Sequence, residues 1–134
     1  MTVIFPEIEP LLITAVKGLF DDRTEPFAAD VWISNAMPKT ATGEPTRHDR
    51  MIIIRDDSGG QLDQVREVAR VGVQFWGSTR EEAADLAQLG RALLNGLSAA
   101  PIKRVRNIMR PVFIEDDQPL FYGTFELTVR GTRL

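Results

Sequence analysis

Four pairs of adjacent carboxylates are the residues of this sequence whose chemistry could support catalysis or metal binding. Two carboxylates held close together can divide the roles of acid and base, or share a hard cation such as Ca²⁺. The pairs are Asp21-Asp22, Asp56-Asp57, Glu81-Glu82 and Asp116-Asp117. Three of them fall in expected turns and one at an expected helix start, where acids are also common for structural reasons. A small α+β enzyme that uses these acidic pairs is therefore the weakest of our functional alternatives.

Other groups that could do chemistry are few. His48 is the only histidine and the chain has no cysteine, so a histidine relay has no partners that the sequence marks. The segment Ser58-Gly59-Gly60 lacks the length and the lysine of a phosphate-binding loop. We assign no catalytic residue, no cofactor-binding residue and no metal ligand, and we expect no enzyme and no cofactor.

The length of 134 residues predicts one domain, residues 1–134, that is large enough to bury a core. No apolar run approaches the roughly 20 residues that cross a bilayer, so we expect no membrane partner. The first residues, Met1 to Pro6, contain no basic segment, which argues against a secretory signal. The formal net charge of −3 gives no long-range attraction to nucleic acid, although it is compatible with local basic patches.

Residues 64–97 are the stretch around which the other elements must be arranged. Alternating apolar residues predict a strand over residues 64–76 with Arg66, Arg70 and Gln74 on its polar face. Ser78 and Glu81 have the spacing of a capping box and predict a helix start. Apolar residues at helical spacing then form one stripe: Ala83, Leu86, Ala87, Gly90, Leu93, Leu94 and Leu97. A strand followed by an amphipathic helix predicts a helix layer packed on a sheet.

The rest of the chain predicts one further helix, over residues 7–20, and four further strands. The strands are expected at residues 27–35, 51–54, 105–115 and 121–130. Residues 55–60 are predicted to form a turn because they are rich in Asp and Gly. Pro111 places its strand at a sheet edge or at a bulge, because proline donates no ladder hydrogen bond. The predicted fold class is α+β, a mostly antiparallel sheet of about five strands with two helices packed on one face.

Residues 37–49 interrupt this pattern with a long polar segment that has little apolar surface to bury. We predict a long loop or hairpin arm, because such a segment is uncommon in a compact domain unless it is functional. Its candidate interface residues are Met37, Lys39, Arg47, His48 and Arg50, the last directly after the arm. The polar faces of the two long strands add Arg66, Arg70, Tyr122, Glu126 and Arg130. A half-exposed sheet with a polar arm is typical of an assembly component, since unpaired sheet edges are usually covered.

Two segments carry a resemblance to a known family. Residues 71–87, with Val71-Gly72-Val73-Gln74-Phe75-Trp76-Gly77 and the following helix start, and residues 122–131 resemble the tail terminator (tail completion) proteins of long-tailed bacteriophages, a siphophage head-to-tail joining family. The N-terminal helix and the total length also fit. The resemblance implies a virion protein that forms a hexameric ring at the head-proximal end of the tail tube, stops tube polymerisation and provides the head-docking surface.

The resemblance also implies partners and a location. The partners would be further copies of the chain, the major tail tube protein and a head-tail connector or neck protein, with viral DNA passing through the lumen without specific binding. The protein would be made in the host cytoplasm and end in the virion. The arm would then become ordered against the tube or a neighbouring subunit, and sheet-face charges of both signs would set the register of the ring. The alternative in the same biology is a neck or connector protein between portal and tail.

Overall fold

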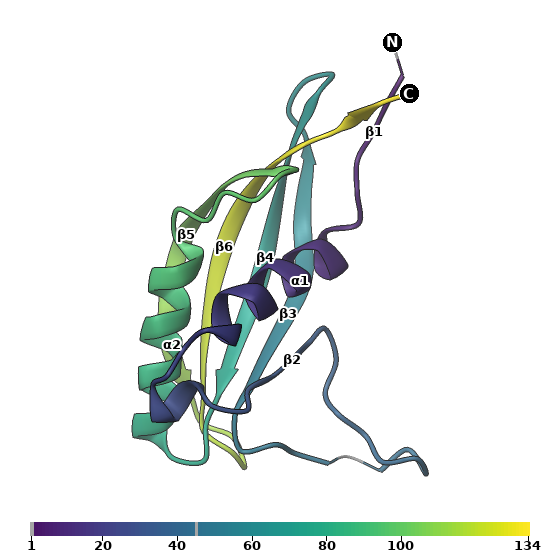
Figure 1. Cartoon of the computed structure of the whole chain (residues 1–134). Coiled ribbons are helices and arrows are strands. Elements are labelled where there is room, and N and C mark those ends of the chain that lie inside the picture. The colour runs from purple at the N-terminus through teal and green to yellow at the C-terminus, as the bar shows by residue number, and fades with distance from the viewer. Residues whose placement is uncertain (1, 45) are drawn as a thin grey trace.

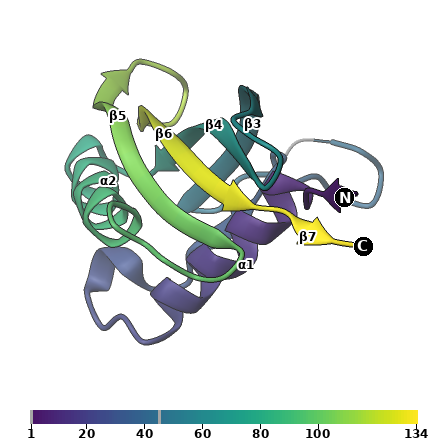
Figure 2. The same cartoon turned by 90° about the horizontal axis from the view of Figure 1, so that it is seen from above.

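The computed structural model describes residues 2–44 and 46–134, so Met1 and Pro45, the latter part of the predicted arm, lie outside the described residues. A five-stranded sheet has the strand order β2-β3-β4-β6-β5. Its strands are β2 (Trp32–Ser34), β3 (Met51–Gln61), β4 (Arg66–Trp76), β5 (Ile102–Ile114) and β6 (Leu120–Arg130). Figures 1 and 2 show both helices on one side of this sheet. The predicted α+β class is confirmed.

One strand pair departs from the antiparallel pattern. β2 runs parallel to β3, with Ile33 beside Ile52, whereas the pairs β3–β4, β4–β6 and β5–β6 are antiparallel. The strand predicted over residues 27–35 is also shorter than expected. Its first part belongs to a 3-10 turn, η1 (Pro26–Ala28), where the fixed φ of Pro26 suits the first helical position, and Asp30 has a φ of +52°, which a strand does not accommodate.

The two helices bury their apolar stripes against the same sheet face. α1 (Ile8–Asp21) turns Ile8, Leu12, Val16 and Phe20 inward, and α2 (Arg80–Leu94) turns Ala83, Leu86, Ala87, Gly90 and Leu94 inward. All of these residues except Ala83 and Gly90 share one core with Ile52, Ile54, Val71, Val73, Phe75 and Phe125. A Cβ added to Gly90 would lie 2.2 Å from the ring of Phe75, so glycine lets α2 approach β4 closely.

The cap of α2 is shifted by one residue from the prediction. Thr79, not Ser78, is the N-cap, and its hydroxyl accepts the backbone N–H of Glu82 at 3.1 Å. Ser78 instead donates its hydroxyl to the Glu82 carboxylate at 3.2 Å. Both residues have a glutamate three positions later, so the capping pattern fits two registers.

The turn predicted over residues 55–60 is wrong, because β3 continues through it to Gln61. Residues Met51–Ile54 are buried on both faces, as predicted, and the exposed remainder stays paired with β4. The pairing shifts between Asp56 and Ser58, so Asp57 is the extra residue of a bulge. Gly59 lies so close to Val68 that a Cβ would meet its carbonyl oxygen at 2.1 Å. The turn lies after Gln61, where the Asp63 carboxylate accepts the backbone N–H groups of Val65 and Arg66.

β5 is an edge strand with bulges, as Pro111 predicted. Its register against β6 shifts between Asn107 and Met109 and again between Met109 and Val112. Beyond the main sheet, β1 (Val3–Ile4) pairs antiparallel with β7 (Thr132–Arg133), a pair that the sequence did not predict. This pair brings the two ends of the chain together beyond the sheet (Figures 1 and 2).

Candidate interaction surfaces

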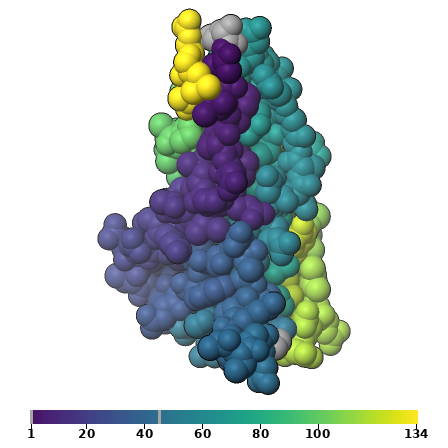
Figure 3. Space-filling view, turned by 90° about the vertical axis from the view of Figure 1, so that its right-hand side faces the viewer, coloured from purple at the N-terminus to yellow at the C-terminus, as the bar shows by residue number. Residues whose placement is uncertain are grey.

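The arm, residues 37–49, closes on itself and covers one end of the open sheet face. Hydrogen bonds from Thr40 N–H to Glu44 O at 2.8 Å and from Thr46 N–H to Pro38 O at 3.1 Å fold it back. Figure 3 shows it below α1 on the edge of the molecule that carries β3. The Gln118 side chain also donates to His48 O at 2.9 Å, which joins the end of the arm to the β5–β6 turn.

A second, smaller apolar cluster lies beneath the arm. Met51, Ile53, Trp76 and Leu120 are buried there, with Trp32, Met37 and Tyr122 packed around them. The arm therefore does bury apolar surface, through Met37 and the buried Pro38, although its sequence predicted almost none. This cluster exists because Met51, Ile53 and Trp76 point away from the helices.

Some candidate residues of the arm are exposed, and others contact side chains or backbone of the same subunit. Lys39 is exposed. The Arg47 guanidinium lies 4.9 Å from the centre of the Trp76 ring, and the His48 ring stacks on Trp32 with centroids 5.5 Å apart. Arg50 lies 2.8 Å from a Glu82 carboxylate oxygen and also donates to Ala29 O at 2.9 Å. Arg50 thus joins the start of β3 to the first turn of α2 within one subunit.

The strand residues predicted for the interface do lie together on the sheet face opposite the helices. Glu126 lies between Arg70, at 3.7 Å, and Arg106, at 3.2 Å. Arg66 pairs with Asp63 at 2.6 Å. Arg130 is exposed and stands directly opposite Arg66 in the β4–β6 register. These residues form an open, charged face above the arm.

Tyr122 marks the boundary between that face and the apolar cluster under the arm. Its ring lies over Gly72, where a Cβ would meet the hydroxyl at 2.4 Å, and its hydroxyl donates to Asp57 at 3.4 Å. Burial, with the Asp57 carboxylate adding to it, raises the pKa of Tyr122. The phenol is therefore a neutral donor held within the subunit.

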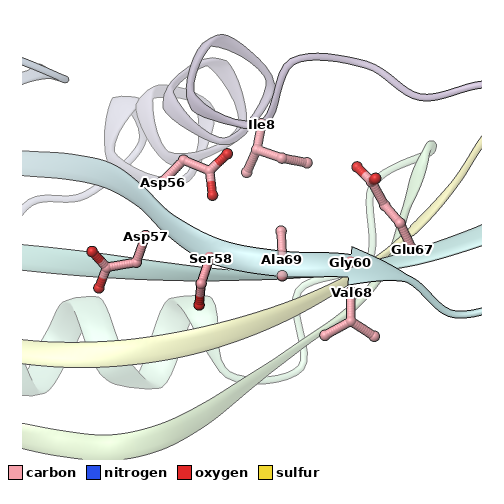
Figure 4. A pocket seen from close by; sticks show the side chains of 9 residues that line it. Ile8, Asp56, Asp57, Ser58, Gly60, Glu67, Val68 and Ala69 are labelled. Atoms are coloured by element: carbon pink, nitrogen blue, oxygen red, sulfur yellow. The ribbon is translucent and has the colours of Figure 1, made fainter.

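One carboxylate pair lines a groove of about 400 Å³ at the outer edge of β3 (Figure 4). Burial, then the charges of Glu9 and Asp57, raise the pKa of Asp56, and burial followed by Asp56 raises the pKa of Glu67. Glu9 accepts the backbone N–H of Asp56 at 2.7 Å, and this hydrogen bond lowers the pKa of Glu9. The groove therefore concentrates negative charge beside the N-terminal end of α1.

The other three carboxylate pairs do not enter this groove. Asp21-Asp22 lies at the end of α1, Glu81-Glu82 in the first turn of α2, and Asp116-Asp117 between β5 and β6. Within residues 2–44 and 46–134, no three metal-ligating side chains come close enough to hold an ion. Of the four pairs, only Asp56-Asp57 therefore lines the groove.

A surface that the sequence analysis missed runs along the free edge strand β5. Four large apolar side chains are exposed there: Ile108 (43%), Met109 (38%), Val112 (39%) and Ile114 (41%). The strand itself was predicted, but its polar and apolar faces were not separated, because the bulges break its alternation. The signal was present as a run of large apolar residues around an edge-strand proline.

Comparisons with family models and with curated proteins find no match to this chain. No helix within the described part of the chain is long and apolar enough to span a membrane.

Proposed function

We propose that this protein is a structural subunit of a long-tailed phage that forms a ring at the head-proximal end of the tail tube, stops tube polymerisation and provides the head-docking surface. The observation that carries the proposal is the apolar stripe of β5, defined as Ile108, Met109, Val112 and Ile114. Edge strands with exposed apolar residues associate with other chains unless they are covered. The apolar stripe on a free edge strand therefore favours a subunit whose β5 edge is covered by a neighbouring subunit in the assembly.

The opposite edge of the sheet, at β2, has a surface at the same position along the strand direction as the end of the apolar stripe. Following the paired residues across the sheet, Ile114 is level with Leu120, Trp76, Met51 and finally Trp32 on β2. If neighbouring copies in a ring are related by rotation about an axis parallel to the strands, residues at the same level remain at the same level. β5 of one copy would then meet β2 and the arm of the next copy. β5 and β2 run in opposite directions, which suits antiparallel contact.

A hollow of about 570 Å³ lies beside β2 and provides room for apolar side chains. Its lining is mixed, with the apolar residues Phe20, Ala28, Ala29, Val31 and Ile33 and the charged residues Lys17, Asp21, Arg23 and Asp30. A stripe on one edge and a hollow on the other form a heterologous, head-to-tail contact, which generates a ring when the rotation closes. In such a ring the arm would lie at a subunit boundary, within reach of the tube or of the neighbouring copy.

The proposed partners are further copies of the chain, most simply six, the tail tube protein and a connector or neck protein, in the virion and, during assembly, in the host cytoplasm. The test is polymerisation of purified tail tube protein with and without this protein. Tubes that stop growing and carry a ring at one end support the terminator. Unchanged growth with binding to a connector instead supports the neck protein.

A further inference from the structure

The open sheet face above the arm carries a charge opposite to that of the whole molecule. It contains six arginines: Arg55, Arg66, Arg70, Arg104, Arg106 and Arg130, all exposed. The carboxylates beside these arginines or on this face are Asp57, Asp63 and Glu126. The chain as a whole has 16 basic and 19 acidic side chains, so this basic surface results from how the fold distributes charge.

The strand register brings these arginines together. Arg66 stands directly opposite Arg130, and Arg70 and Arg106 flank the single carboxylate of Glu126. Like charges directly opposite each other across strands destabilise a sheet. A polyanion on this face would remove that repulsion, whereas the isolated subunit relieves it only in part, through the ion pairs with Asp63 and Glu126.

The size of the face suits a nucleic acid duplex. The arginines lie on four adjacent strands, which is a width of roughly 14 Å across the sheet. Along the strands they extend from Arg55, which is paired with Gly72, to Arg66, six residues away along β4, a length of roughly 20 Å. A duplex carries one charge per roughly 1.7 Å, so about 12 phosphates lie along a length of 20 Å. About half of these can face one surface, a number comparable with the arginines available.

The chemistry of the face points to phosphate rather than to bases. Guanidinium groups bind phosphate oxygens through two parallel hydrogen bonds. The side chains directly among the arginines, such as Ser58, Val68 and Thr128, are small or aliphatic. The Tyr122 ring lies at the border of the face, over Gly72, where it packs against the cluster beneath the arm rather than offering a free surface for base stacking. We propose that this face binds the phosphate backbone of duplex DNA without sequence preference. The inference concerns one subunit and does not depend on ring formation.

Two of the arginines are best suited to test the inference. Within the described residues, Arg104 and Arg130 have no ion-pair partner, whereas Arg66 pairs with Asp63 and the arginines beside Glu126 share its charge. Replacing Arg104 and Arg130 with alanine therefore removes two cations without leaving an unpaired carboxylate. Lys17 and Arg91, exposed on the helices, give a matched control with the same change in charge.

The experiment measures binding of the full chain to two fluorescent duplexes of unrelated sequence, by anisotropy, between 50 and 200 mM salt. Six phosphate contacts predict a slope of log K against log salt of about −5, and a loss of affinity of about 10³-fold over this range. Arg104→Ala with Arg130→Ala should make the slope less steep by about 1.8, to about −3.2, so that the affinity falls by only about 80-fold over the same salt range. The Lys17→Ala with Arg91→Ala control should retain the wild-type slope, and both duplexes should bind equally.

Three results would overturn the inference: no binding by the wild-type protein at 50 mM salt, the same slope in the arginine variant as in the wild type, or an equal loss in the control. Light scattering on the wild type and on each variant measures ring formation separately, so a failure of DNA binding can be told apart from a failure of the proposed ring. A monomer that binds DNA with the predicted slope supports the DNA face and removes the ring. A ring whose mass falls in the Arg104→Ala, Arg130→Ala variant would identify the arginines as a subunit contact and reject the DNA face.

Discussion

Replacing two residues of the apolar stripe with threonine should separate ring formation from folding. Val112 and Ile114 are 39% and 41% exposed, so Val112→Thr and Ile114→Thr keep β-branched side chains on the strand while removing apolar surface at the edge. Full burial of such a side chain contributes about 1.5–3 kcal/mol. The fraction still exposed in the subunit therefore contributes about 0.6–1.2 kcal/mol per residue when a neighbour covers it.

The two changes together should cost about 1.2–2.4 kcal/mol at each contact between subunits, which weakens each contact by roughly 8-fold to 60-fold. Because every contact in a ring is the same, the loss repeats at each boundary. The assay is mass by light scattering across a concentration series, with far-ultraviolet circular dichroism to check the fold. The ring-sized species should form only at a much higher protein concentration than in the wild type, while the circular dichroism spectrum stays unchanged.

The matched control is Ile4→Thr with Leu62→Thr. These side chains are 51% and 57% exposed but lie on β1 and in the β3–β4 turn, away from β5. This variant should assemble like the wild type. An unchanged mass for the β5 variant, or an equal loss of mass in the control, would refute the assignment of the apolar stripe as the subunit contact.

Three further changes test other parts of the structure. Thr79→Ala should lower the free energy of unfolding by about 1 kcal/mol through loss of the α2 cap, measured by urea denaturation; an equal or larger effect of Ser78→Ala would contradict the observed cap register. Asp56→Asn should stabilise the protein near pH 7, because the raised pKa of Asp56 means that folding disfavours its charged form. The gain should disappear as the pH falls below 3.8, and a gain that persists there would contradict burial as the cause. Deleting residues 38–46 should leave a folded protein that no longer stops tube growth, and normal infectious particles from such a mutant would reject a role for the arm.

The sequence predicted the elements whose own apolar pattern determines their burial. β4 and β6 alternate clearly, and the stripe of α2 has helical spacing, so these central elements and the layer order were confirmed. Residues 55–60 were assigned to a turn because Asp and Gly favour turns locally, but pairing with β4 over a long range outweighs that preference. The sequence also did not predict that β2 pairs in parallel with β3, because the pattern of a short strand does not identify its partner strand.

The candidate surfaces were predicted only in part, for a related reason. The polar faces of β4 and β6 were assigned correctly, but their alternation does not show that β3 and β5 add Arg55, Arg104 and Arg106 beside them. The apolar cluster beneath the arm depends on residues distant in sequence, Met37, Met51 and Leu120. Such surfaces are set by which strands become neighbours, and that information is not local.

The central claim is that rings of this chain close the end of a tail tube. The most direct measurement is electron microscopy of tubes grown from purified tail tube protein with increasing amounts of this protein, with tube lengths measured at a fixed time. The proposal predicts that tubes become shorter and stop growing, each with a ring-shaped density at one end. Tubes of unchanged length without added density at either end would contradict it.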